Sequence, residues 1–417
     1  MYLKEIVAAQ KRGEARGITS ICSAHPWVLK TAMLMDGKIL IESTCNQVNQ
    51  FGGYTGMTPA DFVRFVHGIA SENNFPLENI TLGGDHLGPN VWQNEAAELA
   101  MQKSAVMIKD YVRAGFQKIH LDCSMRLADD PEGMLDPEIS AQRTTFLAKV
   151  AEDSVVDGNP EPLYVIGTEV PVPGGARDHE ESVRVTKVED VQQTIDITRH
   201  EFIQLGLESA WERVIAVVVQ PGVEFGDDFI LDYDPQKTKD LTRYIQRQPM
   251  VYEAHSTDYQ TQDALGNLVR DHFAILKVGP ALTFAYREAI FILAMMENEL
   301  FPKYKRSNLI KILDDVMLKN PIYWQSYLHG NPEYLSYARK YSLSDRIRYY
   351  WPNSQVQNAI DKMFKNFHGN PLPLSLLSQF TSKQFEYARE INKNITPEEL
   401  ITEKILEVLQ KYQNACN

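Results

Sequence analysis

Eight short apolar segments, each followed by a stretch of helical character, constrain the fold of this chain more than any other feature. They are rich in β-branched residues and end near Gly, Pro or Asn, as strands do. They begin at Ile18, Lys38, Ile80, Lys118, Leu163, Arg213, Met250 and Phe273. Strands that alternate with helices pair in parallel through right-handed crossovers, and eight such units favour a closed barrel over an open sheet. We therefore predict an α/β protein with a (β/α)₈ TIM barrel over residues 1–290.

The remaining part of the chain has a different pattern. After about Thr283 the strand signals stop, and the sequence shows helical runs separated by aromatic loops. No low-complexity linker separates this part from the barrel. We predict an additional helical region over residues 291–417 that packs on the barrel.

Composition and charge exclude several classes of partner. Lys and Arg number 42 against 55 Asp and Glu, which gives a net charge of −13. Nucleic acids and anionic membranes select basic surfaces, so we expect neither as a partner. No apolar run reaches the roughly 18 residues of a membrane span, and the N-terminus has no secretory signal pattern. The four cysteines, Cys22, Cys45, Cys123 and Cys416, show no C-x-x-C spacing. We expect reduced thiols and a cytoplasmic location.

Polar side chains follow all eight predicted strands. In a (β/α)₈ barrel the carboxyl ends of the strands carry the chemistry. Burying so many unpaired polar groups for structural reasons alone would be costly. We therefore predict a polar active-site mouth there. The residues concerned include Ser23, His25, Glu42, Asn46, Gln47, Asp85, His86, His120, Asp122, Glu169, Gln220, Glu253, His255, Ser256, Asp258 and Lys277.

Three of these residues could converge on one divalent cation. His86, Glu169 and His255 offer imidazole and carboxylate ligands, which suit Zn²⁺, Ni²⁺, Mn²⁺ or Co²⁺. A hydrogen-bonded structural role is an equally open alternative for each histidine. Asp85, next to His86, could act as a general acid or base on a bound substrate.

Two further patterns concern phosphate. GGYTGMTP and GGDHLGPN are rich in glycine but lack the Walker A spacing, and no GxGxxG follows a strand, so we expect no nucleotide cofactor. Arg346 and Arg348 adjoin Tyr349 and Tyr350. These arginines could bind a phosphate at the barrel mouth or could simply stack on packed tyrosines, and the sequence leaves both open.

Several long motifs resemble one known family. IESTCNQVNQFGGYTGMTPADF, LGGDHLGPN, KIHLDCSM, VIGTEVPVPGG, MVYEAHSTDYQT and YSLSDRIRYYWP are similar to the Z subunit family of tagatose-1,6-bisphosphate aldolase (GatZ/KbaZ). The resemblance implies a barrel distantly similar to class II aldolases, in which Asp85 and His86 match an acid/base and metal-ligand pair. It also implies metal-associated roles for Glu169 and His255. VVVQPGVEF, however, lacks the histidine that class II aldolases carry after the sixth strand.

The resemblance implies two functions. One is a metal-dependent 4-epimerase of tagatose and fructose or their 6-phosphates, in which the C3–C4 bond breaks and re-forms with Asp85 as proton carrier. Asp122 and Glu169 would assist, and Zn²⁺, Ni²⁺, Mn²⁺, Co²⁺ or Mg²⁺ would act as Lewis acid. The other is a non-catalytic subunit that stabilises a separate class II aldolase. We expect a homo-oligomer, and we expect the substrate to contact Ser23, His25, Glu42, Asn46, Gln47, Gln220, Ser256, Asp258, Lys277, Arg346 and Arg348.

Overall fold

A closed barrel of parallel strands forms the centre of the molecule, as the alternation of strand and helix predicts. The computed structural model describes residues 2–167 and 183–417. Within these residues eight strands close in the order β1-β10-β9-β6-β5-β4-β3-β2, and every neighbouring pair is parallel. The barrel strands are β1 (Ile18–Cys22), β2 (Ile39–Thr44), β3 (Ile80–Leu87), β4 (Lys118–Leu121), β5 (Leu163–Ile166), β6 (Val214–Val218), β9 (Val251–Ala254) and β10 (Phe273–Val278). The predicted (β/α)₈ fold is confirmed.

A short antiparallel hairpin interrupts the regular pattern after β6. It consists of β7 (Glu224–Phe225) and β8 (Ile230–Leu231). The sequence analysis did not predict it, because two-residue strands are too short to show an alternating pattern.

Helices surround the barrel and extend beyond it on one side. The first part of the chain holds α1 (Tyr2–Lys11), α2 (Pro26–Ala32), α3 (Pro59–Glu72), α4 (Ala97–Arg113), α5 (Pro137–Glu152), α6 (Val188–Gln204), α7 (Glu208–Trp211), α8 (Lys239–Ile245) and α9 (Gln262–Arg270). The later part holds α10 (Pro280–Leu300), α11 (Leu309–Lys319), α12 (Pro332–Tyr341), α13 (Ser354–Phe367), α14 (Leu374–Phe380), α15 (Ser382–Glu390) and α16 (Pro397–Cys416). Four short 3₁₀ turns, Leu77–Asn79, Pro89–Trp92, Pro321–Tyr323 and Arg346–Tyr349, complete the described elements.

The amino-terminal end of the barrel is filled by apolar side chains. Leu3 and Ile6 of α1 are buried in one cluster with Ile18, Leu40 and Ile275 of the strands. Helix α1 contacts β6 and β10 at this end. Since this end is packed solid, only the carboxyl ends of the strands remain for a site, as is usual in such barrels.

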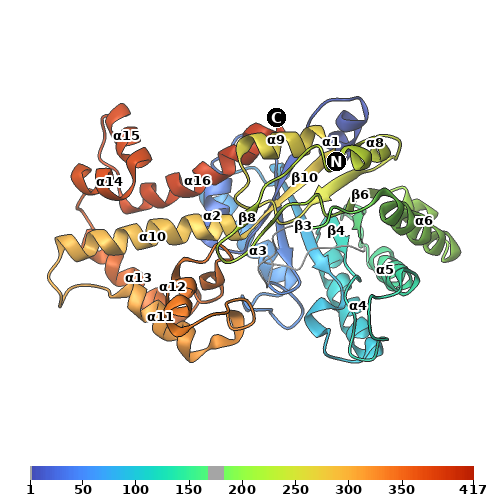
Figure 1. Cartoon of the computed structure of the whole chain (residues 1–417), viewed down its shortest axis with the longest axis horizontal. Coiled ribbons are helices and arrows are strands. Elements are labelled where there is room, and N and C mark those ends of the chain that lie inside the picture. Colours follow the sequence, from blue (N-terminus) through green and yellow to red (C-terminus); the bar gives the residue numbers. More distant parts are fainter. Residues whose placement is uncertain (1, 168–182) are drawn as a thin grey trace.

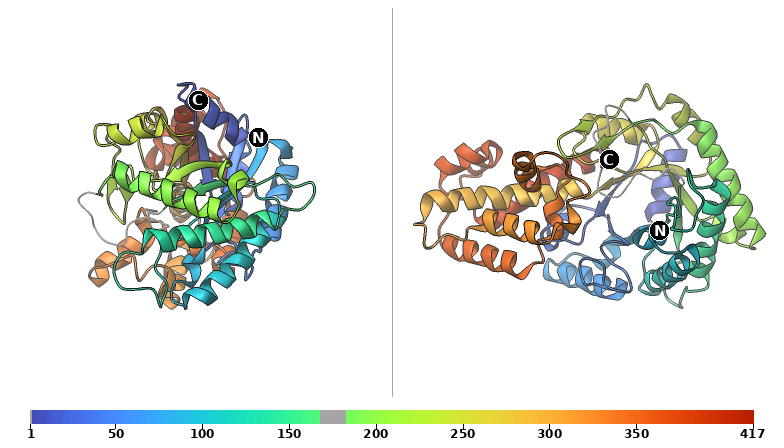
Figure 2. Two further views of the ribbon diagram at one scale, coloured as in Figure 1. Left: turned by 90° about the vertical axis from the view of Figure 1, so that its right-hand side faces the viewer. Right: turned by 60° about the horizontal axis from the view of Figure 1, so that its bottom comes forward.

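The C-terminal helices lie to one side of the barrel, and the last helix returns to it. Figure 1 shows α10 to α15 on the left and the barrel on the right, and the right-hand view of Figure 2 shows the same separation. Helix α16 packs against α9, α10 and α2, so it completes the ring of helices around the strands. Helix α10 is continuous through residue 290, where we placed the domain boundary.

Among the described residues, no helix combines the length and apolar character that crossing a membrane requires.

Candidate active site

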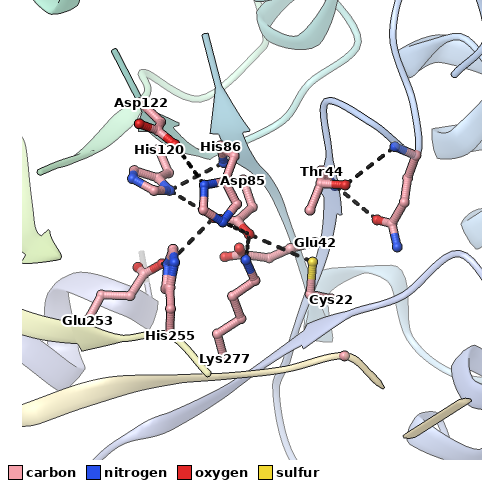
Figure 3. A network of polar contacts seen from close by, with 12 residues as sticks. Cys22, Glu42, Thr44, Asp85, His86, His120, Asp122, Glu253, His255 and Lys277 are labelled. Atoms are coloured by element: carbon pink, nitrogen blue, oxygen red, sulfur yellow. Dashed lines mark hydrogen bonds and ion pairs between the residues drawn. The ribbon is translucent and has the colours of Figure 1, made fainter. Parts of the chain in front are cut away.

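A buried network of charged and imidazole side chains lies at the carboxyl ends of the barrel strands. Figure 3 shows side chains from β2, β3, β4, β9 and β10 that point toward one another, with His86 and Asp85 at the centre. The labelled acidic and imidazole groups are almost wholly buried. The network consists of Glu42, Asp85, His86, Lys118, His120, Asp122, Glu253, His255 and Lys277.

The backbone of β3 brings two adjacent residues into this network. Neighbouring residues of a regular strand point to opposite faces. His86 has a φ of 49°, in the left-handed region, and the pairing of β3 with β4 shifts register between Gly84 and Leu87. This irregularity interrupts the alternation, so Asp85 and His86 both contact network residues. Backbone strain of this kind is concentrated at functional sites.

A glycine on β3 provides space for a carboxylate of the network. A Cβ atom on Gly83 would lie 2.7 Å from Oε1 of Glu42 and 2.9 Å from its Cγ. Real Cβ atoms essentially never approach so closely. The glycine therefore allows the Glu42 side chain to extend across the strand toward Lys118.

Three histidines face one another in the centre of the network. The ring centroids of His86 and His255 lie 4.8 Å apart, those of His86 and His120 5.3 Å, and those of His120 and His255 5.2 Å. A carboxylate fixes each ring: Asp122 Oδ2 lies 2.7 Å from His86 Nδ1, Glu253 Oε1 lies 2.9 Å from His255 Nε2, and Asp85 Oδ1 lies 2.8 Å from His120 Nδ1.

The histidines keep unpaired nitrogen atoms. Nε2 of His86, Nε2 of His120 and Nδ1 of His255 are buried without a hydrogen-bond partner among the described residues. Burial lowers the pKa of His86, and it lowers the pKa of His255 to about 3. Both imidazoles are therefore neutral at physiological pH, which is the form that binds metal ions.

Lys118 bridges two carboxylates beneath the histidines. Its Nζ lies 2.7 Å from Glu42 Oε1 and 2.8 Å from Glu253 Oε2, and all three side chains are fully buried. Burial raises the pKa of Glu42 to about 7. Burial also opposes the charge of Glu253, but Lys118 outweighs it and lowers the pKa of that carboxyl to about 2. The lysine thus holds Glu253 charged beside His255.

Asp85 connects the histidines to a second lysine. Its Oδ1 lies 2.8 Å from His120 Nδ1, and its Oδ2 forms an ion pair with the ammonium of Lys277. Burial opposes the charge on Asp85, but the facing His86 and Lys277 outweigh it, and the pKa of that carboxyl stays well below its ordinary value. Asp85 is therefore an ionised carboxylate in a site from which water is largely excluded.

The donor set fits a divalent cation. One ligand atom from each of Asp85, His120, Glu253 and His255 can be chosen so that all four lie within 4.8 Å of one another. Two imidazoles and two carboxylates suit Zn²⁺, Mn²⁺, Ni²⁺ or Co²⁺. The imidazole nitrogens that lie close to the carboxylates are His120 Nδ1, 2.8 Å from Asp85 Oδ1, and His255 Nε2, 2.9 Å from Glu253 Oε1, so a bound ion would replace these two hydrogen bonds.

A cavity of about 590 Å³ opens beside the network, between the barrel and the C-terminal helices. Its walls include the loops after β1, β2 and β10 and residues of α13. Lys277 and Cys22 line the cavity and also contact Asp85, so they join it to the network. Six of the predicted substrate-binding residues line it: Ser23, His25, Asn46, Gln47, Lys277 and Arg348.

The other predicted substrate-binding residues lie outside the cavity lining, and Glu42, Gln220 and Asp258 have partners of their own. Glu42 pairs with Lys118, and the Gln220 side chain accepts a hydrogen bond from the Gly222 backbone. Asp258 accepts hydrogen bonds from the first residues of α10, as a helix cap does. Ser256 is buried with a φ of 53°.

The two arginines of the predicted phosphate site are placed differently. The Arg346 guanidinium stacks on the Tyr327 ring at 3.6 Å from its centroid, and its Nε donates to the Tyr323 carbonyl. Arg348 lines the cavity.

Glu169, predicted as a metal ligand and catalytic group, lies outside the described residues.

Three network residues received no specific role from the sequence: His120 and Glu253 were named only among the polar residues of the predicted mouth, and Lys118 only as the start of a strand. His120 and Glu253 are candidate ligands, and Lys118 neutralises buried carboxylates. A signal for two of them was present: His120 on β4 precedes Asp122 by two positions, and Glu253 on β9 precedes His255 by two positions, with the second residue of each pair directly after the strand. Residues two apart on a strand point to the same face.

Fold and site together define a (β/α)₈ barrel protein whose strand ends carry a candidate metal-binding and acid–base centre. Comparison with known proteins identifies which barrel proteins this chain resembles in sequence. The model of the family described as D-tagatose-1,6-bisphosphate aldolase subunit GatZ/KbaZ-like matches residues 3–417. The chain belongs to this family.

Individual relatives agree with this assignment. The D-tagatose-1,6-bisphosphate aldolase subunit GatZ of Salmonella dublin is 53% identical over 419 residues, which cover 99% of each chain. The corresponding subunit of Salmonella gallinarum is 52% identical with the same coverage. The crystal structure of a probable tagatose 6-phosphate kinase from Sinorhizobium meliloti is 45% identical, with a TM-score of 0.89 over 96% of this chain and 100% of that one.

Proposed function

We propose that this chain is the Z-type subunit of a tagatose-1,6-bisphosphate aldolase and works in tagatose phosphate metabolism beside a separate catalytic subunit. The observation that carries this proposal is the 53% identity to a GatZ subunit over 99% of both chains. Identity at this level over the whole length supports a shared role and not merely a shared fold.

Assembly with an aldolase tests this proposal directly. The chain would be mixed with the purified class II aldolase catalytic subunit of its source organism, and the complex measured by size-exclusion chromatography with light scattering. We expect a joint complex and a longer half-life of aldolase activity. The chain alone should elute above its monomer mass of 47.5 kDa, as a homo-oligomer. Separate elution with an unchanged half-life would contradict the proposal.

A second function is supported by the network itself. Asp85 is buried beside three histidines that are each held by a carboxylate. Buried unpaired polar groups destabilise a fold, so a subunit without chemistry of its own would have no need of this arrangement. We propose that the chain also interconverts tagatose 6-phosphate and fructose 6-phosphate, which differ only in configuration at C4. The cavity of about 590 Å³ has room for a hexose phosphate.

Inversion at C4 of a ketose limits the chemistry to two routes. In a 2-ketose the hydrogen at C4 is not acidic, so inversion requires cleavage of the C3–C4 bond or oxidation at C4. The aldol route balances without a redox partner. The C4 hydroxyl loses its proton and becomes an aldehyde carbonyl, while the electron pair of the C3–C4 bond passes to the C2 carbonyl and leaves an enediolate. The aldehyde fragment turns, the enediolate carbon attacks its other face to re-form the bond, and the proton returns to the C4 oxygen. A bound divalent cation would supply Lewis acidity toward the sugar oxygens.

The two oxygens of Asp85 face different surroundings. Oδ1 faces His120 and His255, while Oδ2 faces Lys277 and Cys22, which line the cavity. Oδ2 is therefore the atom that would accept the C4 hydroxyl proton and return it. His86, held by Asp122, borders the same carboxylate at 3.7 Å.

A single substitution tests the epimerase proposal. Chelator-stripped protein reloaded with Mg²⁺, Mn²⁺, Co²⁺, Ni²⁺ or Zn²⁺ would be incubated with tagatose 6-phosphate and followed by carbon NMR. We expect fructose 6-phosphate from the wild type and at least a 100-fold slower reaction with Asp85→Asn, on the order of one acid–base contribution. Asp240→Asn is the matched control, because that side chain is 83% exposed. Wild-type rates in Asp85→Asn would refute the role of Asp85 as proton carrier, and no conversion by the wild type with any metal would refute intrinsic catalysis.

A further inference from the structure

Lys277 stands at the boundary between the buried network and the cavity. The side chains of Asp85, His120 and Glu253 are fully buried and that of His255 is 2% exposed, whereas that of Lys277 is 12% exposed. Lys277 is on β10, lines the cavity, and forms an ion pair with Asp85 (Figure 3). It is therefore the network's charged contact with the space that a ligand would enter.

Asp85 has to serve two cations if the network binds a metal ion. Its Oδ1 lies 2.8 Å from His120 and 3.7 Å from His255, on the side of the candidate ligands, and its Oδ2 holds the Lys277 ammonium. One carboxylate charge shared between an ammonium and a divalent ion binds each less strongly than it would bind either alone. Two cations a few ångströms apart in a buried site also repel each other.

We propose that Lys277 is an internal counter-ion of Asp85 that gives way when a divalent cation binds to the network, and that its ammonium then turns into the cavity to hold an anionic group of the substrate. This inference rests on the cation site of the proposed function. Lys277 would thereby bind the substrate directly and also position Asp85, since its movement frees Asp85 Oδ2 for the substrate proton and links metal binding to the binding of an anionic ligand.

The surroundings of Lys277 support this movement. Lysine has a flexible four-carbon stem and a compact charge, so its ammonium can change partners without movement of the strand. The other cation of the cavity wall is already engaged: Arg348 donates to the carbonyls of Ser344 and Asp345 and to the Tyr349 hydroxyl. The Lys277 ammonium, in contrast, has only the Asp85 carboxylate as a close partner among the described residues.

Metal affinity measured on three forms of the full chain tests the proposal. Chelator-stripped wild type, Lys277→Met and Lys277→Arg would be titrated with Mn²⁺ or Zn²⁺ against a chromogenic chelator. We expect Lys277→Met to bind about tenfold tighter or more, because the competing charge is gone, and Lys277→Arg to stay near the wild type. Equal or weaker binding by Lys277→Met would overturn the counter-ion role alone. No binding by any of the three would overturn the cation site as well.

A second measurement uses the unaltered protein, so it does not depend on folding of a variant. Reductive methylation with formaldehyde, read by peptide mass spectrometry, reports how accessible each lysine amine is. We expect Mn²⁺ to speed labelling of Lys277 several-fold. Lys311, which is 75% exposed, should label at an unchanged rate, and Lys118, which is fully buried, should stay unlabelled. Equal or slower labelling of Lys277 with Mn²⁺ would overturn the proposed release.

Discussion

Replacing Lys118 by Met should destabilise the barrel strongly. The Lys118 side chain is fully buried, and its Nζ lies 2.7 Å from Glu42 and 2.8 Å from Glu253. Methionine keeps the volume and removes the charge, so two buried carboxylates lose their shared cation. Removing one partner from a buried ion pair costs about 3–5 kcal/mol, because the remaining charge is left uncompensated. We expect a loss of that size in the free energy of unfolding.

Urea unfolding followed by tryptophan fluorescence and circular dichroism measures this loss. The matched control is Lys311→Met, because Lys311 is 75% exposed in its ion pair with Asp315 and should contribute at most about 1 kcal/mol. Adding Glu253→Gln to Lys118→Met should recover part of the stability, since Glu253 is the carboxylate that Lys118 holds charged, whereas burial already raises the pKa of Glu42 to about 7. If Lys118→Met unfolds at the wild-type urea concentration, or if the added Glu253→Gln recovers nothing, the assigned electrostatics of the network are refuted.

Two further substitutions test the backbone and the cavity wall. Gly83→Ala would bring a Cβ within 2.7 Å of Glu42 and should destabilise by about 1–3 kcal/mol, whereas Gly68→Ala in helix α3, where the Cβ meets nothing within 4 Å, should stabilise by about 0.5–1 kcal/mol. Equal shifts in urea midpoint would contradict this. Burial lowers the pKa of His25 from 6.5 to about 3. Between pH 6.5 and about pH 3 this histidine is therefore protonated in the unfolded state but not in the folded state. The free energy of unfolding falls as the pH falls through this range. His25→Gln should flatten the dependence of unfolding free energy on pH by at most about 1.4 kcal/mol per pH unit, and an unchanged slope in His25→Gln would contradict the assignment.

The barrel could be predicted because each βα unit carries its own local signal. Apolar runs such as VIAVV in β6 are buried at every position, as parallel strands covered on both faces must be. The start of α3 also follows from local signals, since Thr58 caps the helix, Pro59 is its first residue, and Asp61 in its first turn completes a capping box with Thr58. The position of α16 was not readable. Its packing against α2 and α9 joins distant parts of the chain, and an amphipathic helix does not specify which partner its apolar face meets.

The site was predicted less completely than the fold, for a geometric reason. Asp85 and His86 are adjacent, so a regular strand would have pointed them apart, and only the left-handed backbone at His86 lets both join the network. The polar strand ends indicated where the site lies. They could not show that Arg346 stacks on Tyr327 while Arg348 faces the cavity, because both arginines have the same aromatic neighbours in sequence.

Anomalous diffraction tests whether the buried network binds one divalent cation, as we propose. Crystals of the chain would be grown with Mn²⁺ or Zn²⁺ and measured at the absorption edge of the metal. We predict one strong anomalous peak within ligand distance of Asp85, His120, Glu253 and His255, at about 2.0–2.2 Å for Zn²⁺. A map without a peak there, at saturating metal, would show that the network does not bind the ion.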